Sequence, residues 1–408
     1  MKVAEKVLAL GMVCIATPAF SQSSVTIYGV IDAGINYVSN AQTASVTSPT
    51  GRTGASLVQM TTGVMQATRW GLRGTEELGG GYRTLFTLED GFDVTTGRFQ
   101  QGGTFFGRQA WVGLAAPWGK LTMGRQYDSV VDMIGPIQGS TGAGAIAIHP
   151  GDIDNVANSY RINNSVKFTS NTYGGLAFTA LYGFGGIAGS MARDSAYSLG
   201  ASYQNRGLVA GVAYLSVRNP NLSFWGNNAS SSATGNNLGS LTGVQSNPIF
   251  AGFASAKIYQ VVATAVQYDF GAVKAGIGYS NISFQDLNDA GSGSLALTNP
   301  KGYTGTASFN NYSAYFRYLV TPTLQLSGAY DYLTGGRVNN KSSAAYNQFN
   351  LALDYFLSKR TDVYVMGAYI KASGTDSTGG PAVPYTVTAT AANSSNQAIV
   401  RLGIRHLF

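Results

Sequence analysis

The sequence predicts an all-β protein, a transmembrane antiparallel β-barrel of about 16 strands. Apolar residues make up 44% of the chain, yet beyond residue 21 there is no apolar run long enough for a helical membrane span. Charged residues make up only 11%, against roughly 25% in soluble domains. Apolar and polar residues alternate along many segments, as a wall between lipid and a wet interior requires.

The last segment, Gln397–Phe408, shows the alternation clearly. Val400, Leu402 and Ile404 share one face, and the other face carries two arginines. An edge strand of a soluble sandwich can show the same pattern. However, chain ends fray and prefer water, so a strand that ends on Phe408 favours a closed barrel. There the last strand pairs with the first and leaves no open edge in lipid.

Residues 1–21 have the features of a secretory signal peptide. Two lysines flank the start of the short apolar stretch Val7–Ala16, and small residues follow at the usual cleavage positions. We expect cleavage after residue 21, which leaves a single barrel domain, 22–408. The only cysteine, Cys14, lies in the leader, so we expect no disulfide in the mature chain.

The first strands follow directly. Within Ser23–Asn40, isoleucine and valine alternate with residues such as Asp32, over a length sufficient to cross a bilayer with tilt. Ser39–Gly63 is polar and rich in glycine, and we interpret it as a connection. Thr68–Asp93 and Arg108–Asp128 then alternate on both sides of a tight turn, so each predicts a hairpin.

Strands and connections continue to the end of the chain. The further predicted strands are Arg161–Ser170, Leu176–Phe184, Ala196–Tyr203, Leu208–Arg218, Ala256–Phe270, Ala272–Phe284, Tyr312–Leu319, Leu324–Leu333, Asn347–Phe356 and Asp362–Ala372. Short connections alternate with the long ones Asn219–Ser255, Gln285–Asn310 and Ser373–Asn396. Such alternation is typical of membrane barrels, in which short turns face the periplasm and long loops lie outside. We therefore expect the first two long loops to be exposed on cells and to tolerate insertions, for example near Asn236.

Aromatic residues gather near several predicted strand ends, including Tyr268, Phe270, Tyr279, Phe284, Tyr355 and Phe356. They fit a girdle at the water–lipid boundary. They fit ordinary β-propensity equally well, because aromatic residues favour strands in any protein.

Several segments together resemble the general porins of Gram-negative outer membranes, in particular the betaproteobacterial branch. They are SSVTIYGVIDAGINYVSN, RWGLRGTEELGGG, GRQAWVGL, LTMGRQYDS, YDFG, SKRTDVY and the terminal GIRHLF. The resemblance implies a homotrimer of barrels in the outer membrane, in contact with lipid and lipopolysaccharide. Each barrel would be a water-filled pore for passive diffusion of small hydrophilic solutes. The resemblance also implies that the third external loop, about Asp128–Asn158, folds into the lumen, and that Phe408 is an insertion signal.

The family's ladder of basic residues opposite that loop falls on Arg69, Arg108 and Arg161, and Glu89 matches a lumen-facing acid on the third strand. The alternation independently puts Arg69 on the face opposite to Trp70. An arginine on the lipid side costs about 2–4 kcal/mol at the bilayer midplane, which favours the lumen. Each arginine can also be a solvated charge of the lumen or rim without a special role.

The loop departs from the family pattern in one place. Related loops often carry a Pro-Glu-Phe-Gly-Gly turn at the narrowing, whereas Pro136–Ser140 contains no acid. The sequence leaves open which of Asp132, Asp152 and Asp154 faces the arginines. The chain is net basic, with 26 Lys and Arg against 19 Asp and Glu. Together with the arginine ladder and the missing acid at Ile137, this charge leads us to expect a preference for small anions. The predicted constriction consists of Arg69, Arg108, Arg161, Glu89 and Asp132.

Other functions have weaker signals. The chain has two histidines, His149 in the loop and His406 in the last strand, whereas catalysis needs a base beside a nucleophile. No spacing indicates a zinc site, and Asp152-Ile153-Asp154 has too few oxygens for calcium. Basic and aromatic residues do not cluster as in nucleic-acid-binding proteins. We expect no enzyme activity, no cofactor and no metal.

A barrel that serves mainly as a surface adhesin or structural scaffold, with a plugged interior, remains an alternative. Conductance in a lipid bilayer discriminates between this reading and an open channel.

Overall fold

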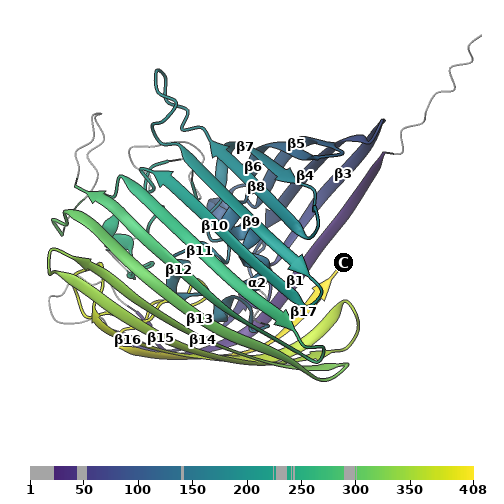
Figure 1. Ribbon diagram of the computed structural model, residues 1–408. Helices are drawn as coiled ribbons and strands as arrows, with labels where there is room; N and C mark the ends of the chain where they lie inside the picture. The colour runs from purple at the N-terminus through teal and green to yellow at the C-terminus, as the bar shows by residue number, and fades with distance from the viewer. Residues whose placement is uncertain are drawn as a thin grey trace, which may run out of the picture.

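The computed structural model describes residues 23–43, 53–138, 142–223, 225–226, 237–239, 241, 244–288, 299 and 301–408. The predicted leader, 1–21, and Asn236 lie outside these residues. The described strands form one sheet that closes on itself as a barrel (Figure 1). Within the described ranges, no helix is long and apolar enough to cross a membrane.

The sheet has 17 strand segments, and their pairings are antiparallel. They are β1 (Ser24–Gln42), β2 (Gly54–Thr62), β3 (Arg69–Gly79), β4 (Tyr82–Gly91), β5 (Gln109–Ala116), β6 (Gly119–Gln126), β7 (Ile162–Ser170), β8 (Leu176–Gly183), β9 (Ala196–Asn205), β10 (Leu208–Arg218), β11 (Ile258–Asp269), β12 (Val273–Leu287), β13 (Gly305–Thr321), β14 (Leu324–Val338), β15 (Ser342–Phe356), β16 (Thr361–Thr375) and β17 (Asn396–Leu407). The short helices are η1 (Gln101–Gly103), α1 (Ser129–Met133), α2 (Gly135–Gln138), η2 (Gly144–Ala147), η3 (Pro150–Asp152) and η4 (Ala251–Phe253).

The second position of the barrel is shared by two segments. β2 pairs with the second half of β1, and β3 pairs with the first half, so the 17 segments occupy sixteen positions. This confirms the predicted strand number. The interpretation of Ser39–Gly63 as a connection is wrong, because β1 continues to Gln42 and β2 begins at Gly54. Small and polar residues in β2 hide a short alternation in which Val58 and Met60 point outward.

The barrel closes between its first and last strands, as the sequence predicts. Val30–Val38 of β1 pairs with Ile399–Leu407 of β17. Beyond this ladder, Phe408 and Gly29 exchange two backbone hydrogen bonds of 3.1 Å. The Phe408 ring lies over Gly29, where a Cβ atom would come within 2.3 Å of it. A residue without a side chain is therefore required at position 29.

Connections at the two ends of the barrel differ in length. One end, which we call the short-turn end, carries the chain termini of the barrel and turns of a few residues. The other, the long-loop end, carries the long connections. Two expectations are wrong there: β14 and β15 are joined by Asn339–Lys341 alone, and the predicted loop Gln285–Asn310 is shortened by β12 and β13. Asn339 and Asn340 adopt positive φ, which permits the tight turn.

The two faces of the wall follow the predicted alternation. Val25 and Leu402 point outward and are 65% and 64% exposed, as residues that contact lipid should be. Arg401, next to Leu402, points inward and has no exposed surface. Its guanidinium donates to Asp32 of β1 at 2.9 Å and to Tyr364 of β16 at 2.8 Å. These two contacts of Arg401 join β1, β16 and β17 at the closure of the barrel.

The predicted aromatic girdle holds only in part. Tyr268, Phe270 and Tyr355 are exposed on the outer surface near the short-turn end, as a girdle requires. Phe284 is fully buried and points inward, so it does not belong to a girdle. It belongs to the largest cluster of buried apolar side chains, which lies inside the barrel.

Candidate functional site

The connection between β6 and β7 folds into the barrel over its described residues, 127–138 and 142–161, which we call the inner loop. Its helix α1 contacts β8, β9 and β10, its helix α2 contacts β10, β11 and β12, and η2 contacts β15 and β16. These contacts place the inner loop against the wall formed by β8–β16, opposite the wall formed by β3–β7 (Figure 1). The expected infolding of the third loop is confirmed.

Hydrogen bonds fix the inner loop to the wall. Asp128 accepts the amide of Val130 at 2.7 Å and so caps α1. The neighbouring amide of Ser129 donates to Ser198 of β9 at 2.8 Å. Further along the loop, the Gln348 side chain of β15 donates to two loop carbonyls at 3.1 and 2.8 Å. The loop is thus held at both sides of the lumen.

His149 forms a buried ionic contact between the inner loop and the wall. Its Nδ1 lies 2.6 Å from Asp154 in the loop, and its Nε2 lies 3.5 Å from Asp331 of β14. Ser280 of β12 also hydrogen-bonds Asp154 at 2.5 Å. Burial alone would lower the pKa of His149, but the carboxylates outweigh burial and raise the pKa to about 9. His149 is therefore charged at neutral pH.

On the opposite wall, the sequence-predicted arginines meet around one acid. Arg108 donates to Glu89 at 2.7 Å, and Arg69 lies 3.5 Å from the other oxygen of Glu89. Tyr127 donates to Glu89 at 2.8 Å and accepts from Arg108 at 3.1 Å. The guanidinium of Arg161 lies over the Tyr127 ring, 5.8 Å from its centre. Four of the five predicted residues therefore form one connected group.

Arg125 lies close enough to this group to interact electrostatically with Tyr127 and Arg161, and the alternation did not predict it. The β6–β7 register shifts between Gly124 and Gln126, with the extra residue on β7, and Gly124 itself has a φ of +134°. A Cβ at position 124 would come within 2.1 Å of the Ala110 carbonyl, so only glycine fits. Next to Gly124, Arg125 donates to the Gly107 carbonyl at 2.7 Å and to Asn163. We call Arg69, Arg108, Arg125 and Arg161, together with Glu89, the arginine cluster.

The loop acids do not join the arginine cluster. Asp132, the fifth predicted residue, pairs with Lys167 of β7 at 2.7 Å. Asp152 accepts amides of its own loop at 2.9 Å, and burial together with the neighbouring Asp154 raises the pKa of Asp152 to about 7. Asp154 pairs with His149. Among the acids singled out in the sequence, Glu89 alone contacts the arginines.

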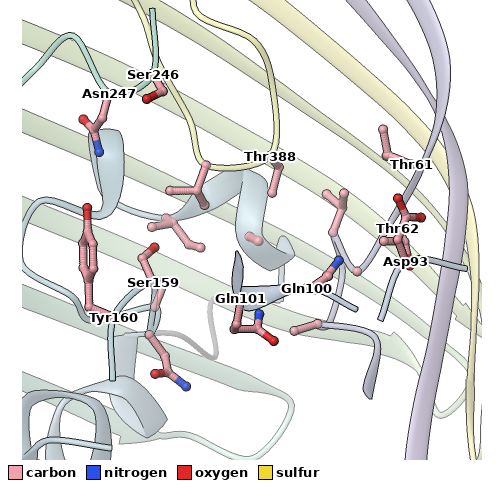
Figure 2. Close-up of a pocket in the computed structure, with 18 of the residues that line it drawn as sticks. Thr61, Thr62, Asp93, Gln100, Gln101, Ser159, Tyr160, Ser246, Asn247 and Thr388 are labelled. Carbon is pink, nitrogen blue, oxygen red and sulfur yellow. The ribbon is translucent and has the colours of Figure 1, made fainter. Parts of the chain in front are cut away.

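A cavity of about 720 Å³ opens between the inner loop, β2 and the loops of the long-loop end (Figure 2). Hydroxyl and amide side chains dominate its lining, including Thr61, Thr62, Gln100, Gln101, Asn158, Ser159, Ser246, Asn247 and Thr388. Its charged lining residues are Asp93, Arg108 and Arg161. The cavity is therefore polar, and the arginine cluster forms part of its wall.

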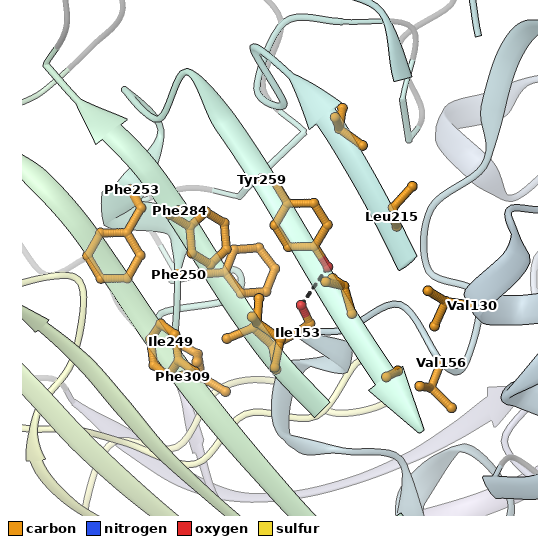
Figure 3. Packing of buried hydrophobic residues seen from close by; sticks show 14 of the residues in the cluster. Val130, Ile153, Val156, Leu215, Ile249, Phe250, Phe253, Tyr259, Phe284 and Phe309 are labelled. Atoms are coloured by element: carbon orange, nitrogen blue, oxygen red, sulfur yellow. Dashed lines mark hydrogen bonds between the residues drawn. The ribbon is translucent and has the colours of Figure 1, made fainter. Parts of the chain in front are cut away.

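The described residues of the connection between β10 and β11 are 219–223, 225–226, 237–239, 241 and 244–257, and we call them the packing loop. Their apolar side chains pack inside the barrel. Phe250 packs against Phe284 of β12, and Phe253 packs against Phe284 and Phe309 of β13, with ring centres 5.4–6.0 Å apart (Figure 3). Tyr259 of β11 donates to the carbonyl of Ile153 in the inner loop at 2.7 Å. The expectation of an exposed loop is therefore wrong for this part. The apolar residues of the stretch Pro248–Phe253 were the overlooked signal.

Comparisons with known proteins agree with this architecture. The family model described as Gram-negative porin matches residues 7–375. An outer membrane porin protein of Bordetella pertussis is 31% identical over 377 residues, which cover 87% of this chain and 91% of that protein. Outer membrane porin protein 32 of Delftia acidovorans is 30% identical over 195 residues, 44% of this chain and 49% of that protein.

Solved structures share the fold. The structure entitled anion-selective porin from Comamonas acidovorans has a TM-score of 0.66 at 21% identity, and the match covers 95% of this chain and all of that one. The trimer form of OmpT, an outer membrane protein of Vibrio cholerae, has a TM-score of 0.60 at 14% identity, over 95% and 99% of the two chains.

The family model spans most of the chain, and the Bordetella relative matches it nearly from end to end. The closed antiparallel barrel with its apolar outer face is consistent with this match. The chain belongs to the Gram-negative porin family of outer-membrane β-barrels.

Proposed function

We propose that the chain assembles as a homotrimer in contact with outer-membrane lipid and lipopolysaccharide, and that each barrel is a water-filled channel. Small hydrophilic solutes would diffuse through it passively, with a preference for anions. The observation that carries the proposal is the arginine cluster in the wall of a polar cavity. Four arginines against Glu89 leave an excess of positive charge at the narrowing.

The size of this excess supports a measurable preference. A unit charge about 6 Å from one arginine, at an effective dielectric constant near 40, gains roughly 1.4 kcal/mol, or tenfold in local concentration. Charges farther away than about 8–10 Å are largely screened at physiological salt. The local cluster therefore matters more than the net charge of the chain. Asp93, on the same cavity, offsets part of the attraction.

Two related structures support the proposed anion preference and the proposed trimer. The Comamonas structure is entitled an anion-selective porin, and the Vibrio structure is a trimer form. Both share the barrel of this chain. The outward apolar surface of the barrel, with residues such as Ile27 and Leu402, would contact lipid or a neighbouring subunit.

The scaffold alternative has one observation in its favour, because the packing loop fills part of the lumen with apolar side chains. Reconstitution into a planar bilayer separates the two functions. A channel gives stepwise conductance, with three closures for a trimer. Its zero-current potential across a salt gradient should show that anions permeate more readily than cations. A protein that inserts as folded trimer yet gives no conductance would overturn the proposal and favour the scaffold.

The proposal assigns no reaction to the chain. Both ring nitrogens of His149 face carboxylates, and Ser280 donates to Asp154 rather than to the histidine. This arrangement ties the inner loop to the wall and does not activate a nucleophile.

A further inference from the structure

A second cavity, of about 470 Å³, lies on the inner wall of β3–β7 towards the short-turn end. Its lining includes Arg73, Arg83, Lys120 and Trp111, with threonine and serine hydroxyls between them. No carboxylate belongs to the lining among the described residues. The cavity is separate from the arginine cluster, because none of that cluster's residues lines it.

The strand register explains why these side chains share one wall. Arg73 pairs with Thr87 and Thr87 pairs with Trp111, so the three side chains lie on the same face of neighbouring strands. Lys120 of β6 pairs with Ala115 of β5, whose β4 partner is Arg83. On β4, Thr87 and Arg83 lie two and six residues from Glu89 and so share its inward phase. Their partners on β3, β5 and β6 share this phase through the register.

Each cation is available to a ligand to a different degree. The guanidinium of Arg73 lies 5.2 Å from the centre of the Tyr28 ring, and the ammonium of Lys120 lies 5.7 Å from that of Trp111. These contacts orient the cations without neutralising them. Arg83 lies 3.8 Å from Glu77, and both side chains are about half exposed, so water screens that pair.

We propose that this cavity is a second anion-binding station that takes small organic polycarboxylates, such as four- to six-carbon di- and tricarboxylates. Arg73, Lys120 and Arg83 supply the charge for two or more carboxylates. The hydroxyl groups of Thr75, Thr87 and Thr169 can donate to the remaining oxygens. The indole face of Trp111 favours a ligand with a carbon skeleton over an inorganic anion.

The role of this station in transport rests on the proposed channel function, whereas its binding of anions does not. In porin-like barrels the short turns face the periplasm, so an anion that leaves the arginine cluster would meet this station next. Binding itself needs no open channel. It can be measured on detergent-solubilised trimers, where a failure of the site and a failure of conduction give different results.

The experiment is calorimetric titration of the wild-type trimer with succinate and, separately, with sulfate, both dianions at pH 7.5. The test variant is Arg73→Gln/Lys120→Gln. The matched control is Arg337→Gln/Lys341→Gln, which removes one arginine and one lysine that are exposed and line neither cavity. We expect succinate to bind the test variant about 100-fold more weakly than the control, about tenfold per cation.

A third variant, Trp111→Ala, tests the ligand class. It should weaken the binding of succinate and leave that of sulfate unchanged. Equal succinate binding by the test and control variants would overturn the station. Sulfate binding as tight as that of succinate in the wild type would overturn its assignment to organic carboxylates. Folded trimer on unheated gels confirms that each variant is compared in the same state.

Discussion

Replacement of Arg401 by methionine should destabilise the barrel more than any change to an exposed arginine. Arg401 is fully buried and donates to Asp32, Tyr364, Asn36 and Thr61 across the closure of the barrel. Methionine fills similar volume, but it leaves the Asp32 carboxylate buried without its cation. Breaking a buried ion pair in this way typically costs 3–5 kcal/mol.

Other donors keep the expected cost near the lower limit. In the variant, Asp32 still accepts the Gln66 amide at 2.8 Å and the hydroxyl of Tyr364. We therefore expect a loss of about 3 kcal/mol. The double variant Arg401→Met/Asp32→Asn should recover most of it, because no charge is then buried alone. The control Arg337→Met removes an exposed arginine and should change the stability by less than about 0.5 kcal/mol.

The assay is equilibrium unfolding of the folded protein in detergent micelles, with tryptophan fluorescence as the probe and guanidinium chloride as the denaturant. If Arg401→Met and Arg337→Met unfold at the same midpoint, the buried pair of Arg401 and Asp32 does not stabilise the barrel as predicted. If the Asp32→Asn replacement in the Arg401→Met background gives no recovery, the cost does not come from the uncompensated carboxylate.

Three further predictions concern assembly, the inner loop and the packing loop. Deletion of Phe408 removes the two hydrogen bonds to Gly29 and should reduce folded trimer in the outer membrane, scored as heat-sensitive trimer on gels; unchanged amounts would contradict the role. The pKa of His149 is about 9 in the folded protein, against an ordinary 6.5. The stability that its charge contributes to the folded state is therefore fully present below about pH 6.5 and is lost as the pH rises through 9. Channel noise should therefore rise between pH 8 and 10 in the wild type and in the exposed-histidine control His406→Gln, whereas His149→Gln should be noisy at every pH. Phe253→Ala should cost about 3–5 kcal/mol by leaving a cavity under the packing loop, measured by unfolding; a change below about 1 kcal/mol would show that the loop does not depend on it.

The wall of the barrel could be predicted from the sequence because the side-chain period of a strand is two. That rule alone placed Arg69 inward and Leu402 outward, and both positions agree with the structure. Arg108 and Arg161 lie just outside β5 and β7, where the period no longer applies, and their assignment depended on the family resemblance. Arg125 escaped prediction because strict alternation groups it with the outward-pointing Leu121 and Met123, whereas the backbone at Gly124, with a φ of +134°, departs from regular strand geometry.

Contacts inside the lumen could not be predicted, because they join segments that are distant in the chain. Asp132 was grouped with the arginines, yet it pairs with Lys167. Nothing in the local sequence shows whether Asp132 pairs with Lys167 or with the arginines, since Lys167 and the arginines all point inward from the wall formed by β3–β7. The packing loop carried a local signal in Phe250 and Phe253, but its many polar residues predict an exposed loop. Burial there depends on facing aromatic residues such as Phe284.

The zero-current potential across a bilayer with a KCl gradient is the most direct test of whether the arginine cluster makes the channel anion-selective. We expect an anion-selective wild-type channel, and a stepwise loss of that selectivity in Arg69→Gln, Arg108→Gln and Arg161→Gln, most pronounced at low salt. Arg337→Gln serves as the control and should keep the wild-type potential. A cation-selective wild-type channel, or three variants with the same potential as the control, would contradict the role of the arginine cluster.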